Sequence, residues 1–354
     1  MNSIILEGFR QIVADEELCD TYSTSNLLSA LNKNGVTLIN DMSVSVTSVC
    51  RGSQTVNSVE RTGLIFTTSS SVMLYCTLPD LKDSAVQMGF RLTLSDGKKY
   101  SSTPSHIGVN GYSFTTPYPD EAASYYYEIF VARDEKGYVQ VSLYCNRSLA
   151  GNASFYASDS QTGNIQVRIG SGTSVFASGV SGTFMLGDMY CLPVAYGNDH
   201  ASSPTLLGSI EVSCSAVSQF SGSHAQNSLN KEIVIGLNTS DSSTGYLLLS
   251  PSQDAAKVTF ENVDNSKGSL IAVQAAVTLQ EAASPNNLLA WSVGCGSSEG
   301  DVISETEAVS DTASWTTVTQ GFMTTPGNTT AFETGSLVFT SNLYNREKTD
   351  QEVS

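Results

Sequence analysis

The fold is decided by the stretch YYYEIFVARDEKGYVQVSLYC, which runs from Tyr125 to Cys145. Two runs rich in aromatic and β-branched residues, Tyr125–Val131 and Tyr138–Tyr144, flank a charged segment that ends in Gly137. Charged residues keep a turn in water, and glycine relieves backbone strain there. The pattern therefore predicts a long β-hairpin.

The second half of this hairpin alternates apolar and polar residues. Side chains on a strand point alternately to opposite faces, so Val139, Val141 and Leu143 share one face. Gln140 and Ser142 share the other face. One buried face and one wet face are typical of an antiparallel β-sandwich. We expect this hairpin to lie in the middle of a sheet built from residues 1 to about 195.

Working outward, the length of 354 residues predicts two domains, since single domains usually have roughly 100 to 200 residues. Short strand patterns separated by turn residues fill both halves, which predicts an all-β protein. The segment LPVAYGNDHASSPTLL, residues 192–207, is the candidate boundary. The predicted fold class is two β-sandwich domains, residues 1–197 and 207–343, followed by a polar tail, residues 344–354.

Individual segments carry more specific predictions. One or two short helical turns are expected within Glu16–Leu31, where leucines recur at uneven helical spacing. Strands are expected at Ser209–Val217, Glu232–Leu237 and Leu270–Leu279. The last of these contains alanines that favour a helix, but its apolar residues alternate strictly, which favours a strand.

Charge excludes several classes of partner. The formal net charge is -17, and no basic run exists that could displace counterions from phosphates. We therefore expect no nucleic-acid partner and no binding to an anionic membrane surface. No run of about 20 apolar residues could span a bilayer, and Met1–Val13 does not read as a signal peptide. These features predict a protein made in a cytoplasm.

Seven cysteines are scattered without a CxxC pair, so a zinc knuckle or a redox motif is not expected. Cys76, Cys145 and Cys191 each follow an apolar or aromatic pair at a strand end. Packing of small apolar side chains is the favoured interpretation. Structural disulfides formed in an oxidising medium remain the alternative.

The search for catalytic chemistry is mostly negative. The three histidines stand in polar loops without the spacing of a metal site, and no GxSxG nucleophile elbow occurs. Glu305 and Glu307 alternate as strand carboxylates of a glycosidase would, but their acidic surroundings favour a solvated loop. The sequence therefore predicts no catalytic residues, no metal site and no cofactor.

Several segments together resemble a known fold family. Gly137–Ala150, then NIQVRIG from Asn164 and FMLGDMYCL from Phe184, are similar to the last strands of a concanavalin-like, laminin-G type jelly roll. The family's final strand carries a hydrophobic-x-D-hydrophobic-Y run, matched here by Leu186–Tyr190. The turn after Tyr144 departs from the family, because Cys-Asn-Arg replaces Asp-Gly. The resemblance implies a jelly roll in the first domain.

The order of motifs also resembles tailed-bacteriophage virion structural proteins. In that class an opening EGF segment and a sandwich precede a second β-domain with an I-x-A-V-Q strand, similar to Ile271–Gln274, and a loop similar to FMTTP from Phe322. Phe332 stands where the class usually has tryptophan. The resemblance implies a non-enzymatic head decoration, collar or tail protein, assembled in the host cytoplasm as a homo-oligomer beside other virion proteins. A polysaccharide-acting hydrolase or a secreted lectin on the same fold is the alternative, since fold does not fix function.

A candidate ligand site lies in the segment HIGVNGYSFTTPY, residues 106–118. Tyr112, Tyr118 and His106, together with the neighbouring Asp120, supply aromatic faces and polar groups that could hold a sugar of a host surface glycan. An ordinary packed loop is the alternative, and it is the favoured interpretation. Recognition of this kind is weak per site, but many copies on one particle would multiply avidity.

Overall fold

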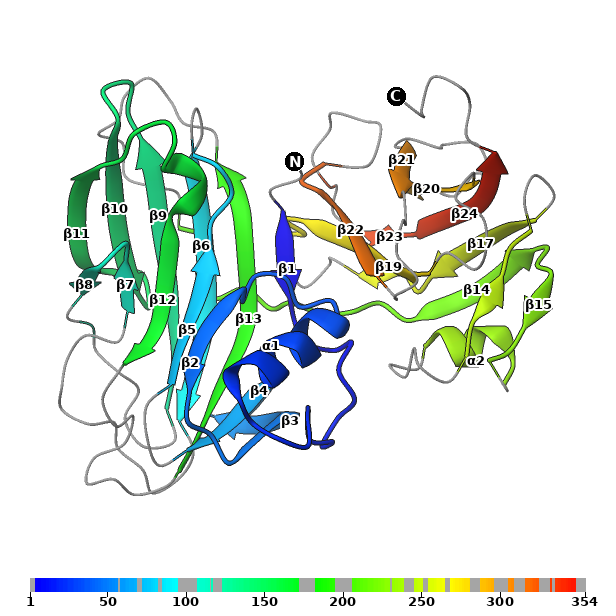
Figure 1. The fold of residues 1–354 in the computed structure, drawn as a ribbon, viewed down its shortest axis with the longest axis horizontal. Coiled ribbons are helices and arrows are strands. Elements are labelled where there is room, and N and C mark those ends of the chain that lie inside the picture. The colour runs from blue at the N-terminus through cyan, green and yellow to red at the C-terminus, as the bar shows by residue number, and fades with distance from the viewer. Residues whose placement is uncertain are drawn as a thin grey trace. The chain divides into compact units, whose positions relative to one another are not determined.

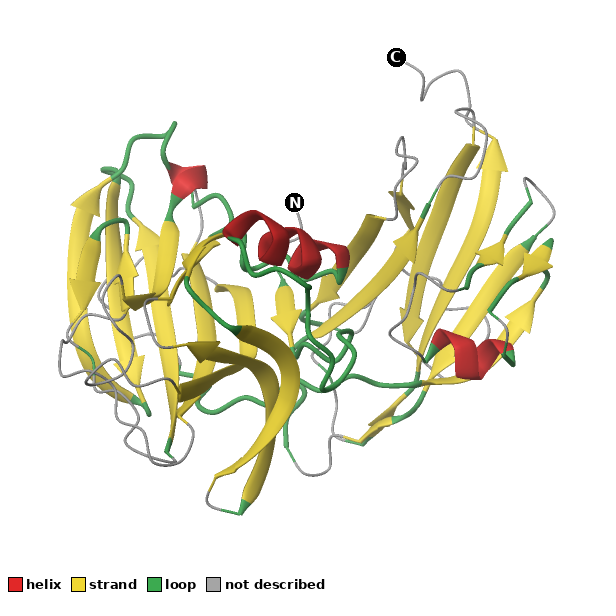
Figure 2. Cartoon of the chain, turned by 60° about the horizontal axis from the view of Figure 1, so that its bottom comes forward, coloured by secondary structure: helices red, strands yellow, loops and turns green. Residues whose placement is uncertain are grey.

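The structure is a computed structural model. It describes residues 4–56, 58–68, 72–81, 85–94, 107–114, 116, 123–171, 182–194, 206–229, 231–238, 245–250, 254–264, 268–280, 287–295, 305–308, 316–324, 332 and 335–347. Contacts within the chain divide it into two compact units, Ser3–Ser213 and Cys214–Ser354. Strands dominate both units, as predicted, and the helical segments are few and short (Figure 2).

The first unit contains two antiparallel sheets that lie face to face (Figure 1). The larger sheet, which we call sheet A, has the strand order β11 (Ser148–Tyr156), β10 (Tyr138–Cys145), β9 (Ser124–Arg133), β6 (Ala85–Leu94), β13 (Gly182–Val194), β4 (Val59–Thr68) and β3 (Ser48–Val56), with β1 (Ile5–Glu7) paired to β13. The smaller sheet has the order β2 (Asp41–Val44), β5 (Val72–Thr77), β12 (Gln166–Ser171), β7 (Ile107–Val109) and β8 (Tyr112–Phe114).

The predicted hairpin is confirmed. It consists of β9 and β10, with Val141 opposite Val131. The face that carries Val139 and Leu143 is buried in the core between the two sheets, while Gln140 is exposed on the other face. The hairpin is not the middle of sheet A, however. That place belongs to β6, every residue of which is buried, because β9 and β13 flank it on either side.

The α-helix α1 (Thr24–Lys33) belongs to this unit. The hydroxyl of Ser23 caps it by accepting a hydrogen bond from the Asn26 N–H at 3.2 Å. Leu27 and Leu31, one turn apart, bury their side chains in the core. The helix is longer than the predicted one or two turns, because the cap and this apolar pair stabilise a ten-residue segment. A short 3-10 helix (Thr162–Asn164) precedes β12.

Among its described residues, the second unit is built on a five-stranded antiparallel sheet with additional two-stranded sheets. The sheet has the order β14 (Val217–Gly222), β17 (Ala255–Phe260), β24 (Phe339–Glu347), β20 (Asn287–Cys295) and β21 (Glu305–Ala308). The additional pairs are β15 (Gln226–Asn227) with β16 (Leu247–Leu248), β18 (Val263–Asp264) with β23 (Ser336–Leu337), and β19 (Val273–Leu279) with β22 (Thr316–Phe322). Trp291 on β20 is buried, and its indole N–H donates to the Ser341 hydroxyl.

Of two strand predictions for this unit, one is confirmed and one is wrong. The strand expected at Leu270–Leu279 is confirmed as β19. The strand expected at Glu232–Leu237 is wrong, because the structure forms the short helix α2 (Ile233–Leu237) there. A short apolar run has no decisive periodicity, so this segment fits either structure, and in the helix Gly236 packs closely against Leu229.

Glu305 and Glu307 do not lie in a loop, contrary to the prediction. They belong to β21, where they stand opposite Ser292 and Ala290 of β20. Backbone pairing with β20 overrides the low β-propensity of this acidic segment.

The cysteines behave in part as the sequence predicts. Cys76, Cys145 and Cys191 are buried within the first unit, and all seven cysteines are free thiols. Burial raises the pKa of the Cys145 thiol to about 11 and that of Cys191 to about 12, which keeps both neutral and weakly reactive. Cys214 is exposed and lies outside any strand. In the part of the chain that the structure describes, no helix is long and apolar enough to cross a membrane.

Candidate functional site

The outer face of sheet A, which points away from the smaller sheet, carries an unusual set of buried polar residues. On β6 the core takes Met88 and Phe90, so strand alternation turns Gln87 and Arg91 to the outer face. Both are nearly inaccessible, with 3% and 6% of their surface exposed. Buried polar and charged side chains of this kind require hydrogen-bonding or charged partners.

A β-bulge brings Asp188 to the same face. The pairing of β13 with β6 shifts by one residue between Gly187 and Tyr190, and Asp188 adopts a φ of 47°. In a regular strand, residues five positions apart point to opposite faces. Leu186 and Cys191 are five positions apart, yet both point into the core. The extra residue therefore lets Asp188 and Tyr190 both face outward, as bulges beside functional sites often do.

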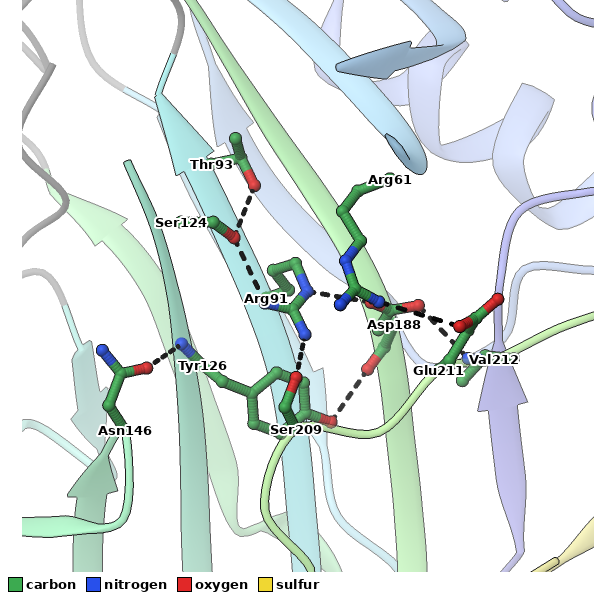
Figure 3. Close-up of polar contacts among 10 residues, drawn as sticks. All are labelled: Arg61, Arg91, Thr93, Ser124, Tyr126, Asn146, Asp188, Ser209, Glu211 and Val212. Atoms are coloured by element: carbon green, nitrogen blue, oxygen red, sulfur yellow. Dashed lines mark hydrogen bonds and ion pairs between the residues drawn. The ribbon is translucent and has the colours of Figure 1, made fainter. Parts of the chain in front are cut away.

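Arg91 and Asp188 form a buried ion pair at the centre of this face (Figure 3). Arg91 Nε donates to Asp188 Oδ2 at 2.9 Å, and Arg61 lies 3.9 Å from the same oxygen. The Arg91 guanidinium also lies 5.1 Å from the centre of the Tyr126 ring. The Tyr126 hydroxyl donates to the Asp188 carbonyl oxygen at 3.2 Å. These contacts fix the Tyr126 ring beside the ion pair.

Glu128 is the second buried carboxylate on this face. Its Oε1 atom accepts from Gln87 Nε2 at 3.1 Å and from the Tyr190 hydroxyl at 3.4 Å. Burial raises the pKa of the Glu128 carboxyl, and hydrogen bonds from backbone N–H groups oppose that rise. Burial likewise raises the pKa of Tyr190, so its hydroxyl keeps the proton that it donates.

The remaining partners come from a segment that crosses this face, residues 206–213, which we call the covering segment. The N–H groups of Leu207 and Gly208 donate to Glu128 Oε1 at 2.9 and 3.0 Å. The Val212 N–H donates to Asp188 Oδ1 at 3.2 Å, and the Ser209 hydroxyl accepts from Arg91. The covering segment belongs by these contacts to the first unit.

The covering segment corrects one strand prediction. Ser209–Val217 was expected to be a strand, but β14 begins only at Val217. The segment's N–H groups bind the carboxylates of sheet A instead of a neighbouring strand. Residues 207–213 were predicted to begin the second domain, but their contacts place them in the first unit, which ends at Ser213. Within the predicted boundary, residues 192–207, residues 195–205 lie outside the described part of the chain.

A small cavity of about 220 Å³ opens beside the covering segment. Its lining consists of Tyr126, Glu128, Asn146, Arg147, Gly208 and Ser209. Asn146 and Arg147 form the turn between β10 and β11, and Asn146 Oδ1 accepts from the Tyr126 N–H at 2.9 Å. Tyr144 stands opposite Glu128 in the register of β9 and β10, on the same outer face. The cavity thus combines an aromatic ring, a carboxyl, an amide and a guanidinium.

The predicted ligand residues are not gathered here. Tyr112 lies on β8 with 45% of its surface exposed. Its ring stacks on that of Phe155, with 5.3 Å between the ring centres. It is not among the residues that line the cavity. His106, Tyr118 and Asp120 lie outside the described residues. Within the described ranges, no group of three or more His, Cys, Asp and Glu side chains is placed to hold a metal ion.

The sequence patterns identify only some residues of the site. The run Leu186–Tyr190, singled out for its family resemblance, contains two members of the polar cluster, Asp188 and Tyr190. The alternation of β6 also marks Gln87 and Arg91 as one face. The covering segment left no signal, since it binds through backbone N–H groups that every residue except proline carries.

Comparison with known proteins gives no family assignment. No family model matches the chain, and no curated protein matches it. Among solved structures, alginate lyase Aly36B is 6% identical with a TM-score of 0.34, over 54% of this chain and 97% of that one. An endo-β-1,4-glucuronan lyase from the fungus Trichoderma reesei is 7% identical with a TM-score of 0.29, over 43% and 90%. Peanut lectin is 10% identical with a TM-score of 0.21, over 46% and 94%. At these values the likenesses assign neither ligand nor activity.

Proposed function

We propose that this chain is a carbohydrate-binding protein and that the cavity on the outer face of sheet A holds the sugar. The observation that carries the proposal is the composition of the cavity. Sugars present hydroxyls, which amide, carboxyl and guanidinium groups bind, and C–H faces, which pack on aromatic rings. Asn146, Glu128 and Tyr126 offer these groups within one cavity.

Size and position support a small polar ligand. Pockets for drug-sized molecules usually enclose about 300 to 1,000 Å³, so a volume of about 220 Å³ suits a single sugar unit. Tyr144 lies directly opposite Glu128 on the adjacent strand, where cross-strand side chains are close neighbours. A longer glycan would extend from the cavity over Tyr144.

A matched pair of tyrosine variants tests this proposal. Binding of neutral and acidic monosaccharides to the full chain is followed by saturation-transfer NMR. Tyr144→Ala, beside the cavity, is expected to lower sugar binding about tenfold, whereas Tyr112→Ala, on β8, leaves it unchanged. The reverse result would move the site to the segment that the sequence favoured. Absence of binding by the unaltered chain would refute the proposal.

A second candidate is cleavage of the bound glycan, and one observation favours it. Glu128 lines the cavity, and burial raises the pKa of its carboxyl, as is common for catalytic acids. Time-dependent shortening of a polysaccharide by the wild type, lost in Glu128→Gln, would establish this activity. A glycan of unchanged length under the same conditions supports a binding protein without catalysis.

The role as a tailed-phage virion component stays a proposal that rests on the order of sequence motifs. It includes a jelly roll in the first domain, partner virion proteins, a homo-oligomeric state and location in the particle. Many copies on one particle would make weak sugar sites effective together. Sedimentation of the free chain tests the oligomeric part, and a strict monomer would count against it.

A further inference from the structure

Arg147 occupies a backbone position that arginine disfavours. Cys145 and Ser148 pair across the turn between β10 and β11, which leaves Asn146 and Arg147 as its two central residues. Their φ angles are 47° and 68°, as in a type I′ turn. Asparagine tolerates the first position, but glycine is the usual residue at the second, and a side chain there costs about 1 kcal/mol.

The side chain held at this position reaches the cavity. Arg147 lines it together with Glu128 and Asn146, and its guanidinium lies against Gly208 of the covering segment. Gly208 has a φ of 76°, and a Cβ at that position would collide with the guanidinium. The absence of a side chain at residue 208 therefore leaves room for the Arg147 head group beside the cavity.

Arg147 differs from Arg61 and Arg91, the other arginines of this face, in having no ion-pair partner among the described residues. Arg91 and Arg61 each lie within ion-pair distance of Asp188. Among the described residues, Arg147 has no carboxylate at that distance and no hydrogen-bond acceptor. The nearby acid, Glu128, accepts four hydrogen bonds at Oε1, from Gln87, Tyr190, Leu207 and Gly208. The cavity therefore presents, beside the Glu128 carboxyl, a guanidinium that has no ion-pair partner among the described residues.

We propose that the cavity selects sugars that carry an anionic group, and that Arg147 binds this group. The inference rests on the proposed carbohydrate-binding function and names its ligand class. A guanidinium offers parallel N–H donors that match a carboxylate or a sulfate ester, and charge-assisted hydrogen bonds of this kind are strong. The shared chemistry is a sugar-linked oxyanion.

Arg147→Gly is the decisive variant because it should fold at least as well as the wild type. Glycine suits the left-handed turn position, so the melting temperature is expected to stay the same or rise. Lys136→Ser is the matched control, since it also removes one positive charge from an exposed turn of the same unit. That turn lies at the other end of β10, about 26 Å away for eight strand residues.

The probes are glucuronate, glucose 6-sulfate and glucose, titrated calorimetrically into the full chain. The wild type is expected to bind at least one anionic sugar about tenfold more tightly than glucose. Arg147→Gly is expected to abolish this difference, and Lys136→Ser is expected to preserve it. Preference for glucuronate or for glucose 6-sulfate identifies the oxyanion as carboxylate or sulfate.

The outcomes separate this inference from the proposed function. If glucose and the anionic sugars bind equally, or if Arg147→Gly keeps the preference, the inference is wrong and carbohydrate binding stands. If Lys136→Ser abolishes the preference as well, the effect comes from net charge and the role of Arg147 is wrong. If none of the three sugars binds to any variant, the proposed function itself fails for sugars of this size.

Discussion

Two parts of one sheet face differ sharply in this protein. At the hairpin end of sheet A, Gln140 on β10 points outward and is exposed. At the centre, Gln87 on β6 points outward in the same way and is 3% exposed. Both glutamines alternate with core residues, so their local sequence patterns are alike. The covering segment lies over the central part, with its N–H groups on Glu128 and Asp188.

The difference shows what strand alternation does and does not report. Alternation reports which side chains share a face, but not whether water reaches that face. A polar face can be buried when another segment brings hydrogen-bonding groups to it, as the covering segment does for Glu128. The buried polar part is also where the cavity lies, so the comparison bears directly on function.

Removing the Asp188 charge should give the largest effect. Asp188→Asn leaves Arg91 buried without its counter-ion, which is expected to lower the free energy of unfolding by about 3 to 5 kcal/mol. Asp159→Asn is the control, because Asp159 pairs with Arg133 at 2.7 Å but its side chain is 71% exposed. That loss should stay below about 1 kcal/mol. Urea denaturation measures both, and equal losses would contradict the contrast between buried and exposed pairs.

The buried carboxyl of Glu7, which has no ion-pair partner among the described residues, makes the stability depend on pH. Glu7 on β1 is 1% exposed and accepts from the Thr37 N–H at 2.8 Å, and burial raises its pKa to about 7. The folded state therefore prefers the protonated acid. This stabilisation is complete below about pH 4.5 and is lost as pH rises through about 7, a change of about 3 kcal/mol.

The measurement for Glu7 is urea unfolding at a series of pH values. The wild type should lose stability relative to Glu7→Gln between about pH 4.5 and 7.5, because the glutamine cannot ionise. Parallel pH curves for the two proteins would mean that the Glu7 carboxyl does not titrate in this window.

The two outward glutamines provide the most direct comparison. Gln87→Ala removes a donor from Glu128 and from Tyr190 in a buried place, and the expected loss is about 1 to 3 kcal/mol. Gln140→Ala on the exposed part should change stability by less than about 0.5 kcal/mol. Thermal unfolding of both variants tests this, and similar losses would show that water reaches both positions.

The smallest effect concerns the fit of the covering segment. Gly208→Ala places a side chain at a positive φ and against Arg147, whereas Gly111→Ala has a similar φ of 85° with open space around it. Backbone strain should cost each variant about 1 kcal/mol. The additional loss in Gly208→Ala reports the contact with Arg147, and adding Arg147→Ala should remove it in a double-mutant cycle.

Much of the fold follows from local patterns in the sequence. The β9–β10 hairpin was predictable because Val139, Val141 and Leu143 alternate with polar residues beside a turn that ends in glycine. The strand β19 followed from the same rule. Short apolar segments such as Ile233–Leu237 escaped prediction, since a run of five residues fits a helix or a strand equally well.

The candidate site was less predictable. Asp188 faces outward only because β13 has a bulge, and strict alternation would place it with Leu186 in the core. Arg147 looked like a simple departure from a family turn, and only its place beside Gly208 gives it a role. The prediction for Tyr112 rests on its residue type alone, and Tyr112 does not line the cavity.

Local sequence patterns are enough to predict the all-β class and which side chains share a face, because strand geometry sets both over a range of one or two residues. Tertiary structure decided which polar face is buried, which carboxylates lack a cation partner and where the cavity lies. These depend on contacts such as that of Gly208 with Glu128, which join residues 80 positions apart. The covering segment makes them largely through backbone N–H groups, which are the same for nearly every residue type and therefore leave no mark in the sequence.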